Sequence, residues 1–320
     1  METQAPYIVV IPGVTGPTYT EAVRTTTGNI HLSYLPEVHG AVALAEVPAN
    51  RVLGVDVSHW QARRDVVPVI HMDWAKCKQA GAQFAFIRAG SINAVNGICY
   101  EDYEFQYNSG VAPDLMPVGY YWYWRPQFSG LLQANYFCDL IENKNWRIPP
   151  WADIEAPLSG MSKNQATDRL EEFVEQIGYR IGYPAIYTRG YYWNDNIDYR
   201  QLWGTLDLAI ARYTDKPEPW GNPGDEDKLR PRDWNDWLFW QWSADRPPNG
   251  RGAEFGAQSN SIDLDYYNGN QDDFEDEFGL GLSLEEKVER LWQAHPGLWD
   301  PELIKVIERN KAEEQASTHG

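Results

Sequence analysis

Positive charge is scarce in this sequence of 320 residues, which has 27 Lys and Arg against 46 Asp and Glu. The net charge of −19 leaves no basic stripe to neutralise phosphates, so the composition argues against nucleic acid as a partner. The same acidity disfavours electrostatic docking on anionic membranes. Because long apolar runs are also absent, we expect no insertion into a membrane.

Cysteine is equally scarce. The three residues, Cys77, Cys99 and Cys138, form no metal-type pair, and an odd number cannot close a disulfide framework. We expect buried free thiols, as in a protein that folds in a reducing cytoplasm. The start, "METQAPYIVVIPGVTG", lacks the basic region and the long apolar run of a signal peptide. We therefore expect synthesis in the cytoplasm and another route to any target outside it.

Aromatic residues are abundant, with 15 Trp and 19 Tyr. Most of them are expected to pack in the core. Flat amphipathic rings also suit ligands with a weakly apolar face, such as sugars, so some of these rings are candidates for sugar contacts.

Short strand-like segments recur from residue 52 onward. Several are apolar almost throughout, as strands buried on both faces are. In order they are "VLGVDVS", "FAFIRAG", "PVGYYWYW", "PPWADIE", "YPAIYT", "LDLAIARY", "WLFWQWS" and "SIDLDYY". Helical patterns separate the early ones, which indicates βαβ units and a parallel sheet. We predict an α/β fold, an irregular TIM-like barrel with about eight strands and five helices, with an open doubly wound sheet as the alternative.

Three helical segments carry local signals. Asp73 is a candidate N-cap of the first, and Ser162 with Gln165 forms a candidate capping box at the start of the third. The second lies within residues 129–143, and its apolar face is predicted to contain Leu132, Tyr136, Phe137 and Leu140.

The barrel, predicted over residues 51–272, is flanked by two segments of different character. Residues 1–50 look like an extended arm or a small β element without an assigned role. Residues 273–320 read as a helical tail, in which Ser283 with Glu286 and Asp300 with Pro301 open two helices. Two interpretations of this tail remain open: it packs on the barrel, or it binds a partner or a second copy. Residues 1–50 or 280–316 are the candidate segments for attachment to a virion or for self-association.

Acidic residues stand at the predicted ends of strands. Asp153 and Glu155, two apart in "WADIE", project from the same face of their strand at the functional end of a barrel. Asp56 ends the first strand and Asp263 and Asp265 lie on the last, and barrel closure makes these two strands neighbours. We expect the carboxylates to converge in one cleft.

Converging carboxylates cannot all ionise comfortably, because burial and mutual repulsion raise the pKa of one of them. Glycoside hydrolysis requires this division between a protonated acid and ionised partners. A site for Mg²⁺ or Ca²⁺ is the weaker alternative, since no carboxylate-rich loop has the usual spacing. The segment from Asp272 to Glu277 is expected to be a solvated acidic loop, and we expect no metal and no cofactor.

At these residues the sequence resembles the family 25 glycoside hydrolases, the Chalaropsis-type lysozymes. The matching segments occur in the family's order over about residues 52–270. They are "GVDVSHWQ", "DWAKCKQAGAQFAFIRAG", "VGYYWYW", "QANYFCDLIE", "WADIE", "YPAIYT", "LAIARY", "WQWS" and "IDLDYYNG". The resemblance implies a barrel enzyme that cleaves the β-1,4 bond between N-acetylmuramic acid and N-acetylglucosamine in bacterial peptidoglycan.

The resemblance also implies roles for the acids. Glu155 is the general acid, Asp153 supports the oxocarbenium-like state or orients the substrate's N-acetyl group, and Asp56 and Asp263 complete the cluster. Further candidates for substrate contact are Tyr121, Tyr123, Tyr187, Tyr213, Trp240, Trp242, Asp265 and Arg88. For Arg88, an ion pair with an acid is an equally good interpretation. His59 and His71 match no metal-ligand spacing and are expected to be structural.

A phage-type enzyme, an endolysin released at lysis or a component of a phage-like particle, agrees with these features. The rival interpretation is a catalytically silent barrel that binds glycan or serves as a structural subunit of such a particle. The presence of all four acids speaks for the enzyme.

Overall fold

The structure is a computed structural model that describes residues 51–213, 223, 230–245 and 250–281 and two short strands. These two strands, β1 (Val23–Arg24) and β2 (Ile30–His31), pair antiparallel. The rest of the predicted arm over residues 1–50, and the two helices predicted from Ser283 onward, lie outside the described residues. The chain divides into two compact units at Phe274 and Glu275. The predicted boundaries at residues 50 and 272 stay predictions.

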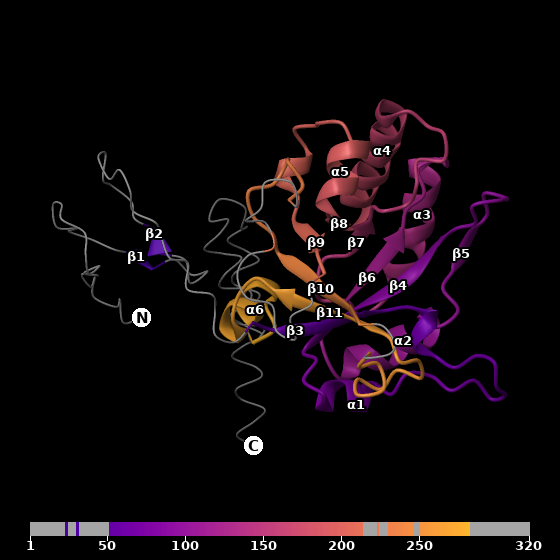
Figure 1. Cartoon of the computed structure of the whole chain (residues 1–320), viewed down its shortest axis with the longest axis vertical. Coiled ribbons are helices and arrows are strands. Elements are labelled where there is room, and N and C mark those ends of the chain that lie inside the picture. The colour runs from indigo at the N-terminus through magenta and orange to yellow at the C-terminus, as the bar shows by residue number, and fades with distance from the viewer. Residues whose placement is uncertain are drawn as a thin grey trace, which may run out of the picture. The chain divides into compact units, whose positions relative to one another are not determined.

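Eight strands form a closed barrel (Figure 1). They are β3 (Leu53–Val57), β4 (Phe84–Ile92), β6 (Val118–Tyr123), β7 (Trp151–Asp153), β8 (Ala185–Thr188), β9 (Leu208–Ala211), β10 (Phe239–Asp245) and β11 (Ile262–Tyr267). Neighbours pair in parallel except β11, which is antiparallel to both β10 and β3. The pairing of β3 with β4 closes the ring. The barrel and its eight strands are confirmed, and the doubly wound alternative is wrong.

One strand was not predicted. β5 (Cys99–Glu101) folds back antiparallel on the end of β4, so that Gly90 pairs with Glu101 and Ile92 with Cys99. This hairpin extends the barrel wall beyond the carboxyl end of β4.

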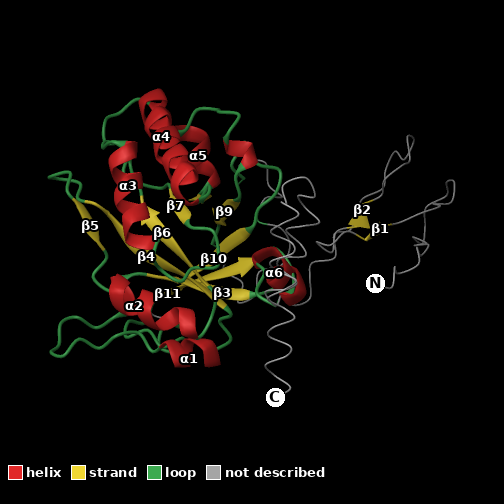
Figure 2. Cartoon of the chain, turned by 180° about the vertical axis from the view of Figure 1, so that it is seen from behind, coloured by secondary structure: helices red, strands yellow, loops and turns green. Residues whose placement is uncertain are grey.

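Six α-helices lie in the described part of the chain (Figure 2). They are α1 (Trp74–Gln79), α2 (Phe105–Val111), α3 (Gly130–Ile141), α4 (Lys163–Ile181), α5 (Gly190–Asn196) and α6 (Gln271–Phe278). Short 3₁₀ helices add η1 (His59–Gln61), η2 (Ala112–Asp114) and η3 (Trp203–Thr205). None of the helices in these ranges has the length and apolarity that crossing a membrane requires.

The helix starts predicted at Asp73 and Ser162 are confirmed. The Asp73 side chain accepts a hydrogen bond from the Lys76 backbone N–H at the start of α1, and Ser162 with Gln165 forms the capping box of α4. α4 ends before Gly182, whose φ of 98° lies in the left-handed region that glycine adopts without strain.

One helix prediction was wrong, and another was wrong at one residue. The acidic segment from Asp272 to Glu277 is helical in α6, because Asn270 and Asp273 exchange side-chain-to-backbone hydrogen bonds at its start and acids in a first turn suit the helix dipole. In α3, Leu132 is 49% exposed. The other three predicted residues hold: Phe137 is buried, and Tyr136 and Leu140 pack against the core. Ala134 and Ile141 are buried as well.

Side-chain alternation along the barrel strands sorts the aromatic residues into two layers. Inside the barrel, Phe86 and Trp151 stack with ring centres 3.5 Å apart, and Phe239 packs against both. Two residues further along the same strands lie Arg88, Asp153 and Gln241, on the same inward face. The barrel interior therefore changes from aromatic to polar toward the carboxyl ends of its strands.

The outer layer lies between the barrel and the helices and contains Trp122, Phe137 and Trp240. The three thiols are free, as expected, and Cys77 and Cys138 are buried whereas Cys99 is half-buried. Burial raises the pKa of the Cys77 thiol to about 12.

Candidate active site

A cavity of about 200 Å³ opens at the carboxyl ends of the barrel strands, and nine of the twelve predicted site residues line it. These are Asp56, Arg88, Tyr121, Tyr123, Asp153, Glu155, Tyr187, Tyr213 and Asp263. Carboxylates from three distant segments of the sequence thus meet in one place, as the strand order predicted.

Strand register explains this convergence. Asp56, near the end of β3, is the direct antiparallel partner of Asp263 on β11. Across the barrel, Asp153 is the last residue of β7, flanked by Tyr123 on β6 and Tyr187 on β8. Glu155 follows two residues later, beyond the end of the strand, where it reaches further into the opening.

Asp56 belongs to a buried hydrogen-bonded chain. The Tyr187 hydroxyl donates to Gln241 Oε1 at 2.7 Å, and Gln241 Nε2 donates to Asp56 Oδ2 at 2.6 Å. Burial, followed by the charges of Asp263 and Asp265, holds the pKa of Asp56 well above its usual range, and the Gln241 hydrogen bond acts in the opposite direction. The amide therefore supports the ionised form of Asp56 against its surroundings.

Asp153 is buried, with 5% of the residue exposed, and its Oδ1 has no hydrogen-bond partner among the described residues. Burial and then the charge of Glu155 raise the pKa of Asp153 well above its usual range, while Arg88, Arg189 and Arg125 act against this rise. Asp56 and Asp153 thus both have raised pKa values, and both are acids to which the resemblance gave supporting roles.

Glu155 is the more accessible member of the pair, with 29% of its side chain exposed. Its Oε2 lies 3.5 Å from Arg189 Nη2, and the same nitrogen donates to the Tyr213 hydroxyl at 3.0 Å. Glu155 is thus in contact with both the open cavity and a guanidinium group.

The tyrosines of the cavity keep their protons. Burial raises the pKa of Tyr123 and Tyr213 to about 12 and that of Tyr121 and Tyr187 higher still. Their neutral hydroxyls can both donate and accept hydrogen bonds, which suits contacts with sugar hydroxyls.

Arg88 forms no ion pair with an acid in the described part of the chain. Its Nη2 donates to the Tyr100 hydroxyl at 3.4 Å, and its guanidinium lies 5.1 Å from the Tyr123 ring centre. Arg125 covers the same ring at 5.0 Å. Tyr123 is therefore fixed between two cations.

Trp240 and Asp265 do not line the cavity, and this corrects their predicted placement. Trp240 alternates with the inward Gln241 on β10, so it points to the outer core layer, where it packs against Trp237 and donates to the Arg212 carbonyl oxygen at 2.8 Å. Trp242 shares that side and is also buried.

Asp265 pairs with Gly54 on β3, one step deeper in the barrel than Asp263, and is fully buried. Burial, followed by the charge of Asp263, raises the pKa of Asp265 well above its usual range, and a side-chain hydrogen bond with Asp56 acts against this rise.

Five lining residues were missed: Ser58, Trp60, Trp151, Arg189 and Gln241. Gln241 was discoverable, since alternation in "WQW" turns the glutamine inward whenever the two tryptophans turn outward. Trp60, 69% exposed on η1, and Arg189, directly after β8, lie outside the strands, and no periodic signal marks them.

His59 and His71 are structural, as predicted. Nδ1 of His59 lies 2.7 Å from buried Asp102, and Nδ1 of His71 lies 2.6 Å from buried Glu104. These contacts fasten the segment between β3 and α1, which carries Trp60, to the turn before α2. No group of three His, Cys, Asp or Glu side chains in the described ranges is arranged to hold a metal ion.

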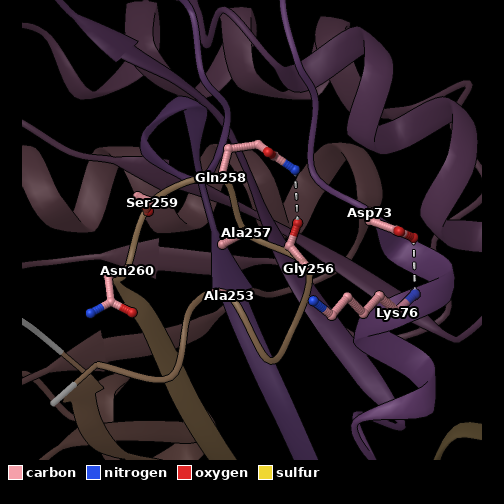
Figure 3. Close-up of a pocket in the computed structure, with 8 residues that line it drawn as sticks. All are labelled: Asp73, Lys76, Ala253, Gly256, Ala257, Gln258, Ser259 and Asn260. Carbon is pink, nitrogen blue, oxygen red and sulfur yellow. Dashed lines mark hydrogen bonds between the residues drawn. The ribbon is translucent and has the colours of Figure 1, made fainter.

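A second, larger hollow of about 440 Å³ lies between the start of α1 and the loop before β11 (Figure 3). Its one carboxylate, Asp73, accepts a hydrogen bond from the Lys76 backbone N–H and caps α1. The polar side chain of Gln258 donates to the Gly256 carbonyl oxygen. This hollow gathers no set of acids, so we place the chemistry in the smaller cavity.

A closed α/β barrel that gathers paired carboxylates and tyrosines at the carboxyl ends of its strands has the parts of a glycoside hydrolase. The family model for glycosyl hydrolases family 25 matches residues 55–250. The chain belongs to this family.

Solved structures of the same fold agree with this assignment. The chain is similar to the bacterial lysozyme from Streptomyces coelicolor, with 26% identity, a TM-score of 0.53 and coverage of 70% of this chain and 94% of that one. A family 25 glycosyl hydrolase from Bacillus anthracis is 23% identical with a TM-score of 0.52, and the match covers 71% of this chain and 93% of that one. The family GH25 lysozyme from Aspergillus fumigatus is 24% identical with a TM-score of 0.52, and the match covers 72% of this chain and 99% of that one. Curated proteins gave no match.

Proposed function

We propose that the chain is a muramidase that cleaves the β-1,4 bond between N-acetylmuramic acid and N-acetylglucosamine in peptidoglycan. The observation that carries the proposal is the meeting of Asp56, Asp153, Glu155 and Asp263 in one cavity of a family 25 barrel. The names of the similar structures, lysozymes among them, support the same substrate.

Glu155 is the general acid in this proposal. Of the neighbouring acids Asp153 and Glu155, it is the one with 29% of its side chain exposed to the cavity, so it can reach the glycosidic oxygen of a bound chain. Asp153 is buried beside it, and a buried carboxyl next to another carboxyl favours one shared proton over two negative charges. The pair therefore supplies a proton to the leaving oxygen.

The remaining acids support the positive charge that develops on the sugar ring. Asp153 stabilises the oxocarbenium-like state or orients the N-acetyl group of the substrate, once the proton has left the pair. Asp56, which accepts the Gln241 hydrogen bond, and its partner Asp263 face the cavity from β3 and β11. They surround the reaction centre with negative potential.

Exchange of Glu155 for Gln tests the proposal, because glutamine keeps the shape and removes the transferable proton. We expect clearing of a peptidoglycan suspension to slow by about 100-fold or more, in the range that general acid catalysis supplies. Glu172→Gln, on the exposed face of α4, is the matched control and should clear at the wild-type rate. Equal clearing by wild type and Glu155→Gln would refute the role of Glu155.

The setting of the enzyme stays a prediction. Action after release at lysis or from a phage-like particle, and attachment through residues 1–50 or 280–316, concern segments that lie outside the described residues apart from β1, β2, Leu280 and Gly281. If neither wild type nor Glu155→Gln clears peptidoglycan while both bind it, the catalytically silent barrel is the better interpretation.

A further inference from the structure

Arg189 is a cation set among the acids of the cavity. It lies directly after β8, and 47% of its side chain is exposed. Tyr213 holds it in place, since Nη2 donates to the tyrosine hydroxyl at 3.0 Å and the guanidinium carbon lies 5.1 Å from the ring centre. The side chain is thus oriented and still open to a ligand.

The hydrogen-bonding capacity of Arg189 is only partly used. A guanidinium group carries five N–H donors, and within the described part of the chain only Nη2 has partners. One of these is Glu155 Oε2 at 3.5 Å, which is longer than the 2.7–2.9 Å typical of a charge-assisted hydrogen bond. Nε and Nη1 remain available, and the loose contact with Glu155 is easily exchanged for a better one.

We propose that Arg189, supported by Tyr213, binds a carboxylate of the substrate next to Glu155. This inference rests on the proposed muramidase function and specifies which part of the substrate the site recognises. A muramyl residue differs from glucosamine by a lactyl ether, whose carboxyl group is either free or linked to a peptide that itself carries carboxylates. The planar fork of a guanidinium group matches a carboxylate in two parallel hydrogen bonds, whereas sugar hydroxyls do not require it.

The surrounding charges limit the ligand to a single negative charge at this position. Asp56, Glu155 and Asp263 line the same cavity, so a more highly charged group would be repelled. One carboxylate is compensated by Arg189.

Equilibrium titration calorimetry with three disaccharides tests the inference without depending on hydrolysis. The first ends in N-acetylmuramic acid with a free lactyl carboxylate, the second carries the peptide L-Ala-D-isoglutamine on that carboxyl and so has one free peptide carboxylate, and the third contains only N-acetylglucosamine. Each is titrated into wild type, Arg189→Gln and Arg147→Gln. Arg147 is the matched control, since its exposed side chain has no partner among the described residues and its backbone N–H bonds Val118 at the opposite end of the barrel.

We expect wild type and Arg147→Gln to bind one of the carboxylate-bearing disaccharides about 10- to 100-fold more tightly than the uncharged one, and Arg189→Gln to lose this preference. Stronger binding of the first or of the second disaccharide identifies the lactyl or the peptide carboxylate as the ligand. Equal affinity of wild type for all three, or an equal loss on all three in Arg189→Gln, would overturn the inference.

A parallel clearing assay separates this inference from the proposed function. If wild type clears peptidoglycan but shows no preference for carboxylate-bearing disaccharides, the inference fails and the muramidase stands. If the preference is present and peptidoglycan is not cleared, the muramidase fails and the carboxylate subsite stands.

Discussion

Replacement of Gln241 by Leu removes the hydrogen bond that supports the ionised form of Asp56. Gln241 Nε2 donates to Asp56 Oδ2 at 2.6 Å, and both residues are almost fully buried. A hydrogen bond to a charged group contributes about 1.5–3 kcal/mol. Since one pKa unit corresponds to about 1.4 kcal/mol, the pKa of Asp56, already raised by burial, should rise by about one to two further units.

This shift has a defined kinetic signature. If catalysis requires ionised Asp56, an increase in its pKa means that a higher pH is needed to ionise it. The acidic limb of the profile of kcat/KM against pH therefore moves to higher pH by about one to two units. The assay measures initial rates on soluble glycan chains from about pH 4 to pH 9. Tyr187→Phe removes only the anchor of the amide, at 2.7 Å from Gln241 Oε1, and should produce a smaller shift in the same direction.

Gln79→Leu, an exposed glutamine on α1, serves as the control for general effects of the substitution and should leave the profile unchanged. A Gln241→Leu profile that keeps the wild-type pH dependence, scaled only in height, would refute the reasoning. Asp56 would then not be the group whose ionisation limits the rate.

Two further predictions concern stability. Gly130→Ala should lower the free energy of unfolding in urea by about 1–3 kcal/mol, because its Cβ would lie 2.2 Å from the Arg169 carbonyl oxygen, whereas Gly110→Ala, with nothing within 4 Å, should raise it by about 0.5–1 kcal/mol. A loss in both variants would contradict this. The raised pKa of Asp265 means that the folded state holds its proton more firmly, so that stability is lost as pH rises from about 4 through the folded-state pKa. Asp265→Asn should therefore match wild type at pH 4 and become increasingly more stable above it, and a gap that is constant with pH would argue against a raised pKa.

The barrel was predictable because its strands are short, apolar and regularly spaced. Their order also placed Asp56, Asp153 and Glu155 at one end, since strand direction and closure follow from the βαβ pattern. Asp263, near the start of the last strand, reaches the same end because β11 runs antiparallel to its neighbours, which that pattern does not predict. The helix α6 was missed because a run of acidic residues is typical of a solvated loop. The reciprocal hydrogen bonds between Asn270 and Asp273, which start the helix, are seen only in the structure.

The finer details of the site depend on side-chain direction, which the sequence pattern leaves undecided. Trp240 was a reasonable choice for sugar contact by residue type, yet the β10 alternation buries it and turns Gln241 to Asp56 instead. Arg189 lies outside the periodic segments, and its contact with Glu155 arises only when β8 takes its place beside β7.

The most direct test of the proposed function identifies the new chain ends that wild type releases from purified peptidoglycan. The digest is reduced with borohydride, and the reduced sugars are identified by mass spectrometry. Cleavage of the proposed bond leaves muramic acid at the reducing end, so N-acetylmuramitol should accumulate and should be nearly absent from the Glu155→Gln digest. Accumulation of N-acetylglucosaminitol, or the absence of any new reducing end, would contradict a muramidase.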